Sequence, residues 1–472
     1  MAISLSQQAL LKHQITDANR EHHFLGTVKV NCGGPKTPSN LRRKSIQGPN
    51  STITHIMTSP THNAYLPVWI SDTNIDPVWI EQVTGLKDVS KCVVEDISNQ
   101  GRRREAIKDG TTLKLVVSFQ DASKELGLVI KQVPLAGQDH SKMLGLSREA
   151  LFYLHLAPRL VDGKVIPKVH HSFGDMATGA KLILMEDLSA DYLDSGILFG
   201  PGNPNNWTRD LRSLTAKAYP NIADKPPSSQ QVAHQTFLAV AKIHATFWKD
   251  KSLLSHSYLR CADWIQGQDK KSWEASQQYI QGIWDELKRN HQLDTVIQWD
   301  PVVLACVTKA MEGISWEAQL KRIHVSGGHW TLVHGDFWPG NILISTNCGH
   351  EEGNLYDLKL LDWEMVGIGS GPQDLGQYIL SNMDPLERRM CEQSLIATYH
   401  SELIRLGVKD FSWEECWREY KIGGVERWLW FLVYFVGQEG ALLKWAQFFH
   451  DQIASFVADH RITPDDLVQP RP

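Results

Sequence analysis

Two stretches of the sequence decide the fold: Thr331–Asn341, which reads TLVHGDFWPGN, and Leu358–Glu364, which reads LKLLDWE. The apolar residues at the start of each stretch predict short strands, and Ile342–Ile344 predicts another strand between them. Polar loops join the predicted strands. This frame of strands and loops delivers three polar side chains, those of Asp336, Asn341 and Asp362.

These residue types, in this order, suit phosphoryl transfer. One carboxylate takes the proton of the attacking hydroxyl group, while an amide and a second carboxylate hold the Mg²⁺ that neutralises the phosphates. Asp336 fits the base, and Asn341 and Asp362 fit the metal ligands. Taken singly, Asp336 could be a turn residue and Asp362 a helix N-cap, but their joint spacing and flanking strands favour a site.

The motif H-G-D-x-x-x-x-N, followed by an apolar strand and D-W-E, resembles the aminoglycoside phosphotransferase and choline kinase-like family. The form HGDFWPGN is most similar to its ecdysteroid kinase-like branch, and AKIHATFW at residues 241–248 resembles a helix of the family. The resemblance covers residues 76–460. It implies an α+β, bilobal protein-kinase-like fold, with a small antiparallel β-sheet N-lobe and a larger, mainly helical C-lobe. It also implies ATP-dependent phosphorylation of a small molecule's hydroxyl group.

The expected domain organisation follows from this fold. Residues 1–70 form a disordered or loosely packed extension, 71–187 the nucleotide-binding N-lobe, 188–462 the catalytic and acceptor-binding C-lobe, and 463–472 a tail. Acidic residues are sparse before residue 70, as in organelle-targeting segments. We expect a cytoplasmic protein, with an organelle as the alternative if residues 1–66 include a transit peptide.

The nucleotide site is expected around Lys131 and Glu149. Lys131 lies near the end of the predicted strand Leu126–Val133, at the position of the lysine that contacts the α- and β-phosphates. Glu149 opens the next predicted helix, where the resemblance puts the glutamate that pairs with this lysine. Singly, such a lysine is usually a surface residue, and such a glutamate favours the helix dipole. Together they favour nucleotide binding, with Glu186 and Leu188 in the predicted hinge beside the adenine.

The predicted phosphate loop departs from the protein-kinase pattern. Residues 98–111 contain no G-x-G-x-x-G and carry three successive arginines. Without this motif, the sequence does not indicate how the phosphates are held. This motivates an alternative, a catalytically weak or inactive kinase-like nucleotide-binding or interaction protein. A protein kinase is disfavoured, because Gly335 replaces the arginine of H-R-D and no A-P-E motif follows.

Three further residues are assigned structural roles. His334 is expected to orient the catalytic loop through hydrogen bonds to the backbone, and His244 to be a hydrogen-bonded core histidine. The family resemblance implies that Asp374 braces the backbone of the catalytic loop, although its position also fits a helix N-cap. Trp338 is left open between stacking on substrate and packing in the core.

Composition excludes several classes of function. The net charge of −5 gives no electrostatic case for binding nucleic acid. Seven scattered cysteines without a C-x-x-C motif disfavour a disulfide framework or zinc site. The longest apolar run, Trp428–Val436, is far shorter than the roughly 20 residues that cross a membrane. We therefore expect ATP, Mg²⁺ and a small-molecule hydroxyl acceptor as ligands, no nucleic acid, no membrane span, and a monomer or weak dimer.

Overall fold

The computed structural model describes residues 75–96, 111–121, 123–160, 163–219, 226–260, 270–290, 292–313, 316, 328–346, 356–438 and 441–467. These residues belong to one compact unit of the chain. The predicted extension over residues 1–70, nearly all of the predicted phosphate loop and the end of the tail lie outside the described residues, so these predictions stay untested.

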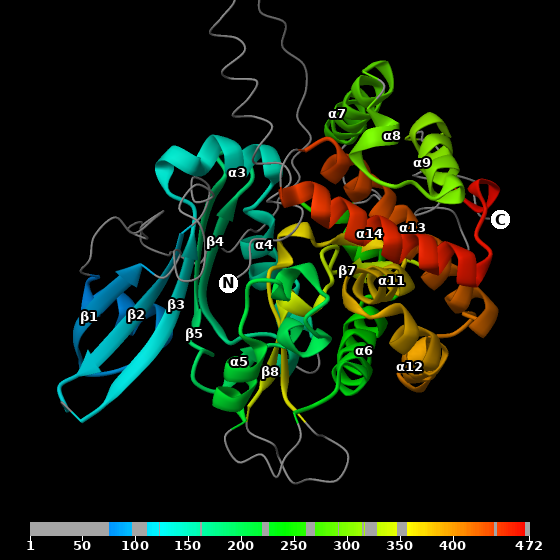
Figure 1. The fold of residues 1–472 in the computed structure, drawn as a ribbon. Coiled ribbons are helices and arrows are strands. Elements are labelled where there is room, and N and C mark those ends of the chain that lie inside the picture. The colour runs from blue at the N-terminus through cyan, green and yellow to red at the C-terminus, as the bar shows by residue number, and fades with distance from the viewer. Residues whose placement is uncertain are drawn as a thin grey trace, which may run out of the picture. The chain divides into compact units, whose positions relative to one another are not determined.

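A five-stranded antiparallel sheet forms the first large element of the described chain (Figure 1). Its spatial order is β1-β2-β3-β5-β4, and its strands are β1 (Val89–Asp96), β2 (Thr111–Phe119), β3 (Glu125–Gln132), β4 (Val169–Asp175) and β5 (Ala180–Glu186). Alternate residues of β2 are buried, as expected of a strand with one face on a core. The register pairs Lys131 of β3 with Thr112 on one side and Ile183 on the other, so this lysine is central in the sheet.

Three helices accompany this sheet: α2 (Pro77–Thr84), α3 (Gln138–Leu144) and α4 (Arg148–His155). Helix α2 begins after Asp76, which caps it by accepting a hydrogen bond from the Val78 amide at 2.9 Å. This helix packs on β1 and β4 and buries Trp79 and Ile80. Helix α4 packs on β4 and β5 and carries Glu149, which is fully buried.

The described residues after β5 are mainly helical. Their helices are α5 (Leu211–Ala218), α6 (Ser229–Thr246), α7 (Lys270–Arg289), α8 (Leu293–Val296), α9 (Pro301–Gly313), α11 (Gly371–Asn382), α12 (Pro385–Arg405), α13 (Trp413–Val436) and α14 (Ala441–His460). Five short strands lie among them: β6 (Tyr192–Asp194), β7 (Thr331–Val333), β8 (Ile342–Ser345), β9 (Leu358–Leu360) and β10 (Gly367–Gly369). They pair as β6-β8-β9 and β10-β7. The predicted α+β class, an antiparallel sheet followed by a mainly helical part, is confirmed.

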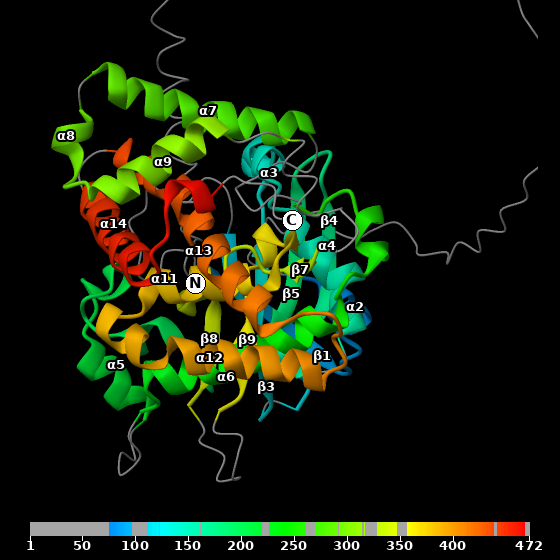
Figure 2. The ribbon, with the colours of Figure 1, turned by 90° about the vertical axis from the view of Figure 1, so that its right-hand side faces the viewer.

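Helix α13 forms the centre of the helical core. Every residue from Ile422 to Val436 is buried, so the longest apolar run of the sequence lies in a core helix. Helices α11 and α13 cross closely at Gly376 and Gly424, where a Cβ added to Gly376 would lie 2.6 Å from the Gly424 Cα. Figure 2 shows α12 running beside α6, with which it packs.

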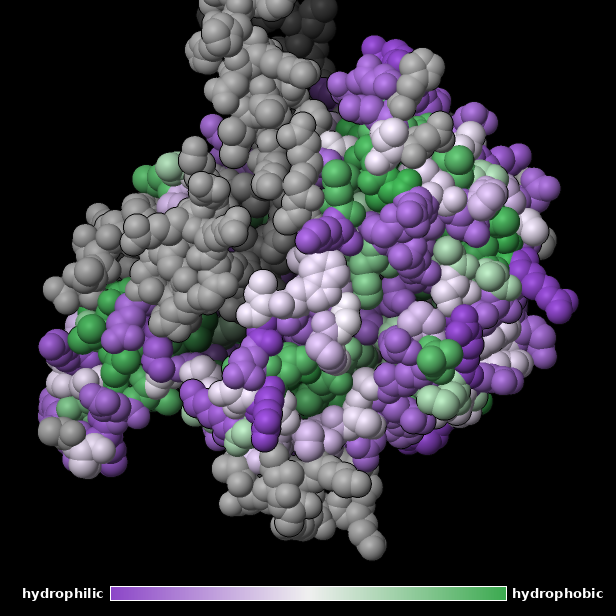
Figure 3. Space-filling model, viewed as in Figure 1, coloured by the Kyte–Doolittle hydropathy of each residue, from purple (hydrophilic) through white to green (hydrophobic). Residues whose placement is uncertain are grey.

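The described helices also bear on the membrane prediction. None of them combines the length and the apolar character that a membrane crossing requires. On the face shown in Figure 3, hydrophilic and hydrophobic residues are interspersed over the described surface. The most exposed large apolar side chains of the described residues, Met390 and Leu386, stand one turn apart on α12.

Two expectations about segment boundaries were wrong. The sequence of Val165–His170 predicts a strand, but β4 begins only at Val169, because Gly163–Val165 forms a 3-10 turn and Pro167 has no amide to donate to a ladder. The Pro- and Asn-rich composition of residues 199–228 predicts an irregular excursion, but this segment contains helix α5. Asp210 caps this helix by accepting a hydrogen bond from the Ser213 amide at 3.1 Å.

Candidate active site

The loop between β7 and β8 carries the first predicted site residues, and its shape depends on glycine. Gly335 has a φ of +79°, and a Cβ at this position would lie 2.2 Å from the carbonyl oxygen of Met365. No other residue fits there, which gives a steric reason for Gly335 where protein kinases have arginine. Trp338, left open by the sequence, is buried, and its ring lies over Gly340.

His334 and Asp374 hold this loop through its backbone. Asp374 accepts hydrogen bonds from the amides of His334 at 2.7 Å and Gly335 at 3.2 Å. His334 Nε2 lies 2.8 Å from the Leu361 carbonyl oxygen and must carry the proton to donate to it. Burial lowers the pKa of His334 despite the opposing charge of Asp374, which keeps the ring neutral at pH 7. The structural roles predicted for both residues are confirmed.

His244 supports the same loop from α6. Its ring is fully buried, with Nδ1 2.8 Å from the Tyr399 hydroxyl and Nε2 3.5 Å from Asp374 Oδ2. The His244 carbonyl accepts a hydrogen bond from the Thr331 hydroxyl at 2.7 Å. The prediction of a hydrogen-bonded core histidine is therefore confirmed.

The structure brings Asp336 and Asn341 into direct contact. Asn341 Nδ2 donates to the backbone carbonyl of Asp336 at 2.9 Å and to its Oδ2 at 3.0 Å. Gln377 Nε2 approaches the other carboxylate oxygen, Oδ1, at 3.4 Å. The Asn341 carbonyl accepts the amide of Leu361 at 2.9 Å, which ties this loop to the residue before Asp362. Asp336 is thus a buried carboxylate oriented by two side-chain amides.

Asp362 follows β9 in a backbone conformation that is rare outside glycine. Its φ of 65° and ψ of 57° are left-handed, which costs a non-glycine residue about 1–3 kcal/mol. The next residue, Trp363, stacks on Phe152 of α4 with ring centroids 4.0 Å apart and planes 12° from parallel. This stacking fixes the DWE segment against the helix that carries Glu149.

Lys131 lies at the centre of a buried cluster of charges. Its Nζ is 2.6 Å from Glu149 Oε2, 2.7 Å from Asp362 Oδ1 and 3.2 Å from Glu364 Oε1. The sequence predicted the pair of Lys131 with Glu149, and the structure brings the two together. It also brings Asp362 to the same ammonium group, a contact that the sequence does not predict.

A second lysine, which sequence reasoning missed, completes this cluster. Lys181, near the start of β5, is almost fully buried; its Nζ lies 3.0 Å from Glu149 Oε2 and also pairs with Glu364 Oε1. The two ammonium groups therefore share the same two carboxylate oxygens. The available signal was a lysine inside the otherwise apolar run AKLILM.

The pKa directions follow from this crowding. Burial would lower the pKa of Lys131, but Asp362, Glu149 and Glu364 hold it well above its usual value. Burial raises the pKa of Asp362, and the two glutamates add to that rise against the effect of Lys131. Burial would raise the pKa of Glu364 too, but the two lysines lower it overall. Glu364 is therefore the ionised partner of both lysines at neutral pH.

The carboxylates of this cluster fit a hard cation. Ligand oxygens of Glu149, Asp362 and Glu364 lie within 4.8 Å of one another. Among the described residues, Glu149 Oε1 and Glu364 Oε2 are buried without a hydrogen-bond partner, so each retains accepting capacity. Mg²⁺ prefers carboxylate and amide oxygens and usually takes only one or two carboxylates from a protein, and Asp362 suits it as the carboxylate of this set that Lys181 does not contact.

The two predicted hinge residues lie outside the cluster. Glu186, which ends β5, accepts the Lys168 amide at 2.8 Å through Oε1, and Lys359 Nζ is 3.6 Å from the same oxygen. The Leu188 carbonyl accepts the amide of Tyr192 at 3.0 Å. Both residues belong to the segment that leads from the five-stranded sheet into β6.

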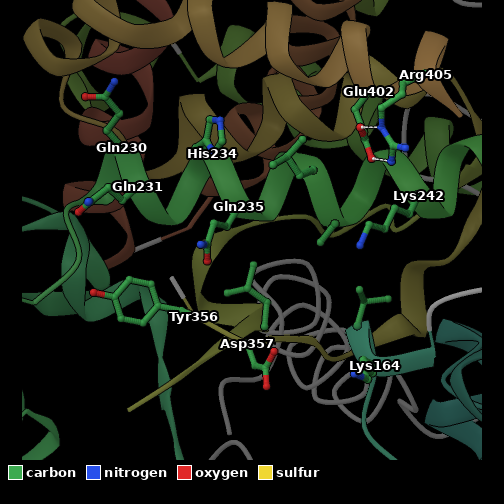
Figure 4. Close-up of a pocket in the computed structure, with 14 residues that line it drawn as sticks. Lys164, Gln230, Gln231, His234, Gln235, Lys242, Tyr356, Asp357, Glu402 and Arg405 are labelled. Carbon is green, nitrogen blue, oxygen red and sulfur yellow. Dashed lines mark hydrogen bonds and ion pairs between the residues drawn. The ribbon is translucent and has the colours of Figure 1, made fainter. Parts of the chain in front are cut away.

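A cavity of about 720 Å³ lies elsewhere, against one face of α6 (Figure 4). Most of the residues that line it are polar, among them Gln231, His234 and Lys242 of α6 and the ion pair between Glu402 and Arg405. None of the predicted site residues lines it. We place the candidate active site at the charged cluster, because it brings together three of the predicted site residues, Lys131, Glu149 and Asp362.

Residues 210–409 match the model of the ecdysteroid kinase-like family. The predicted family resemblance is confirmed. The matched segment includes Asp336, Asn341 and Asp362, whereas Lys131 and Glu149 precede it. Lys131 and Glu149 are therefore assigned to the site by the geometry of the charged cluster and not by the family match.

Two solved structures are distantly similar to the chain. An ethanolamine kinase from Plasmodium vivax has 9% sequence identity, with 79% of this chain and 82% of that chain covered and a TM-score of 0.39. A microcompartment-associated aminopropanol kinase has 12% identity, with 84% of this chain and all of that chain covered, again with a TM-score of 0.39. No curated protein matched the sequence.

Proposed function

We propose that this protein transfers the γ-phosphoryl group of ATP to a hydroxyl group of a small molecule. The observation that carries the proposal is the contact of Lys131 with Glu149 and Asp362, at 2.6 and 2.7 Å. A lysine for the nucleotide phosphates, a glutamate that holds it and an aspartate for the metal are three of the parts that ATP-dependent phosphoryl transfer uses. The family match over residues 210–409 supports the same reaction class.

Nucleotide binding is assigned to residues of the sheet and of the segment after it. Lys131 would contact the α- and β-phosphates while Glu149 fixes its direction. The backbone of Glu186 to Leu188 would meet the adenine edge. Asn341 and Asp362 would hold Mg²⁺, which neutralises phosphate charge when it is bound.

Asp336 is assigned as the general base. As the acceptor oxygen forms its bond to the γ-phosphorus, the bond from that phosphorus to the β,γ-bridging oxygen breaks, and the hydroxyl proton passes to Asp336. The hydrogen bonds of Asn341 and Gln377 hold this carboxylate in one orientation. General-base assistance contributes about 10²–10⁴ in rate, and positioning and electrostatics must supply the remainder.

The acceptor can be identified by its chemical class. Release of ADP with Mg²⁺ and ATP would be measured against a panel of small alcohols, aminoglycosides, choline and sterols. We expect one class to stimulate ADP release, with phosphate recovered on that acceptor. Tight ATP binding without transfer to any acceptor would instead favour the second candidate, an inactive kinase-like nucleotide-binding protein. The missing G-x-G-x-x-G over residues 98–111 motivates that alternative.

A further inference from the structure

Lys181 has no place in the pattern that predicted the site, yet it is the most deeply buried lysine of the cluster. Its side chain is 2% exposed, compared with 14% for Lys131. A buried ammonium group is costly unless opposite charges compensate it. Lys181 meets this requirement with Glu149 Oε2 and Glu364 Oε1, the oxygens that also contact Lys131.

The four groups form a closed ring of alternating charge. Lys131, Glu149, Lys181 and Glu364 each contact two neighbours of opposite sign, and Asp362 adds one further contact, to Lys131 alone. Two ammonium groups thus face three carboxylates. If a metal ion compensates the charge of Asp362, the two lysines and two glutamates of the ring carry no net charge.

Glu364 cannot follow Lys131 toward a nucleotide. Arg148 Nη1 donates to the Glu364 carbonyl oxygen at 2.7 Å, and the neighbouring Trp363 is stacked on Phe152, so the backbone at this residue is fixed. Without Lys181, Lys131 would be the ammonium group of this cluster left in contact with both Glu149 and Glu364. Lys131 would then be held within the cluster, because its departure would leave the buried carboxylates of Glu149 and Glu364 without an ammonium partner.

We propose that Lys181 is a positioning residue, which neutralises Glu149 and Glu364 and so leaves Lys131 available for the phosphates of ATP. This inference rests on the proposed function, in which Lys131 contacts the nucleotide. Lys181 itself touches neither nucleotide nor acceptor and acts through the two glutamates. Its substitution should weaken nucleotide binding, and removal of one of those glutamates should restore it.

The test is a charge-rescue experiment on the full chain. The dissociation constant for ATP with Mg²⁺ would be measured by titration calorimetry for the wild type, Lys181→Met and the double variant Lys181→Met/Glu364→Gln. Lys309→Met on α9 is the control, since its lysine is half exposed and far along the chain from the cluster. Thermal unfolding of each protein would establish that it is folded.

We expect Lys181→Met to weaken ATP binding by at least about tenfold, and the double variant to bind within about threefold of the wild type. Unchanged binding by Lys181→Met, or a loss that Glu364→Gln does not rescue, would overturn the inference. If Lys181→Met does not fold, the double variant decides: binding near the wild-type level supports the inference, and its own failure to fold or bind overturns it. A wild type that does not bind ATP would instead refute the proposed function, and the inference with it.

Discussion

Lys131 Nζ and Asp362 Oδ1 lie 2.7 Å apart, although 231 residues separate them in the sequence. The first residue belongs to a central strand of the five-stranded sheet and the second follows β9 in the mainly helical part. In the proposed reaction the lysine serves the phosphates and the aspartate serves the metal. Their contact therefore joins the phosphate-binding half of the proposed site to its metal-binding half.

The first prediction concerns the phosphate half. Lys131→Met should weaken binding of ATP with Mg²⁺ by at least about tenfold, because the variant loses the ammonium group proposed for the α- and β-phosphates. It should also lower the unfolding temperature, since Asp362 then loses its contact with an ammonium group, while Glu149 and Glu364 keep only their contacts with Lys181. Calorimetric titration beside the Lys309→Met control measures the first effect. A folded variant that binds ATP as the wild type does would contradict the role of Lys131.

The second prediction concerns the metal half. If Asp362 holds Mg²⁺, wild-type affinity for ATP should fall when EDTA removes the metal. In Asp362→Asn the affinity should be weaker and should no longer depend on Mg²⁺. Titrations with and without EDTA measure both quantities. Equal Mg²⁺ dependence in the two proteins would show that Asp362 is not a metal ligand.

The third prediction concerns the backbone of the catalytic loop. Gly335→Ala should destabilise the fold by about 1–3 kcal/mol, because a side chain disfavours the φ of +79° and its Cβ would lie 2.2 Å from Met365 O. Gly282→Ala is a matched control in α7, where no atom lies within 4 Å of the added Cβ. This control should be neutral or stabilising, by about 0.5–1 kcal/mol. Urea unfolding compares them, and equal stability of the two variants would exclude the steric role of Gly335.

The fourth prediction uses a second buried ionic network, which joins α12, α13 and α14. Glu392 contacts Arg388 at 3.1 Å, the Tyr420 hydroxyl at 2.8 Å and His460 at 3.1 Å. Burial would raise the pKa of Glu392, but the hydrogen bond from His460 and the charge of Arg388 lower it below the usual 4.5. A carboxyl group with a lowered folded-state pKa contributes stability above pH 4.5, and that contribution is lost as the pH falls through the folded-state pKa.

Glu392→Gln should therefore lower the free energy of unfolding by about 2 kcal/mol at pH 7. The difference from the wild type should shrink as the pH falls below 4.5. Urea unfolding at several pH values measures this dependence. A difference that stays constant from pH 7 to pH 3 would show that the ionised form of Glu392 is not what stabilises the three helices.

The sequence predicted the parts of the site that lie close together in the chain. The HGD and DWE stretches have local patterns, since a turn that requires glycine lies between apolar strands, and Asp374 and His244 occupy positions familiar from the family. Lys131 and Glu149 could be paired because the family resemblance implies such a pair and the order of strand and helix locates it in this sequence. These predictions depended on short-range features, which a single sequence displays.

Long-range features could not be predicted in this way. Lys181 looked like part of a plain apolar strand, because its partners come from α4 and from a segment 183 residues further on. The left-handed backbone at Asp362 likewise has no local signal, since aspartate seldom adopts that conformation. The start of β4 was misjudged because apolar residues flank Pro167 on both sides. In each case tertiary contacts, and not propensity, decide the outcome.

The most direct test of the proposed phosphotransfer is acceptor-dependent ADP release by Asp336→Asn, with the affinity for ATP measured on the same preparation. Asparagine keeps the size of the side chain but cannot take the hydroxyl proton. The account predicts a loss of at least about 10²-fold in acceptor-stimulated turnover, while the dissociation constant of ATP with Mg²⁺ barely changes. Turnover equal to that of the wild type would contradict the assignment of Asp336 as the base.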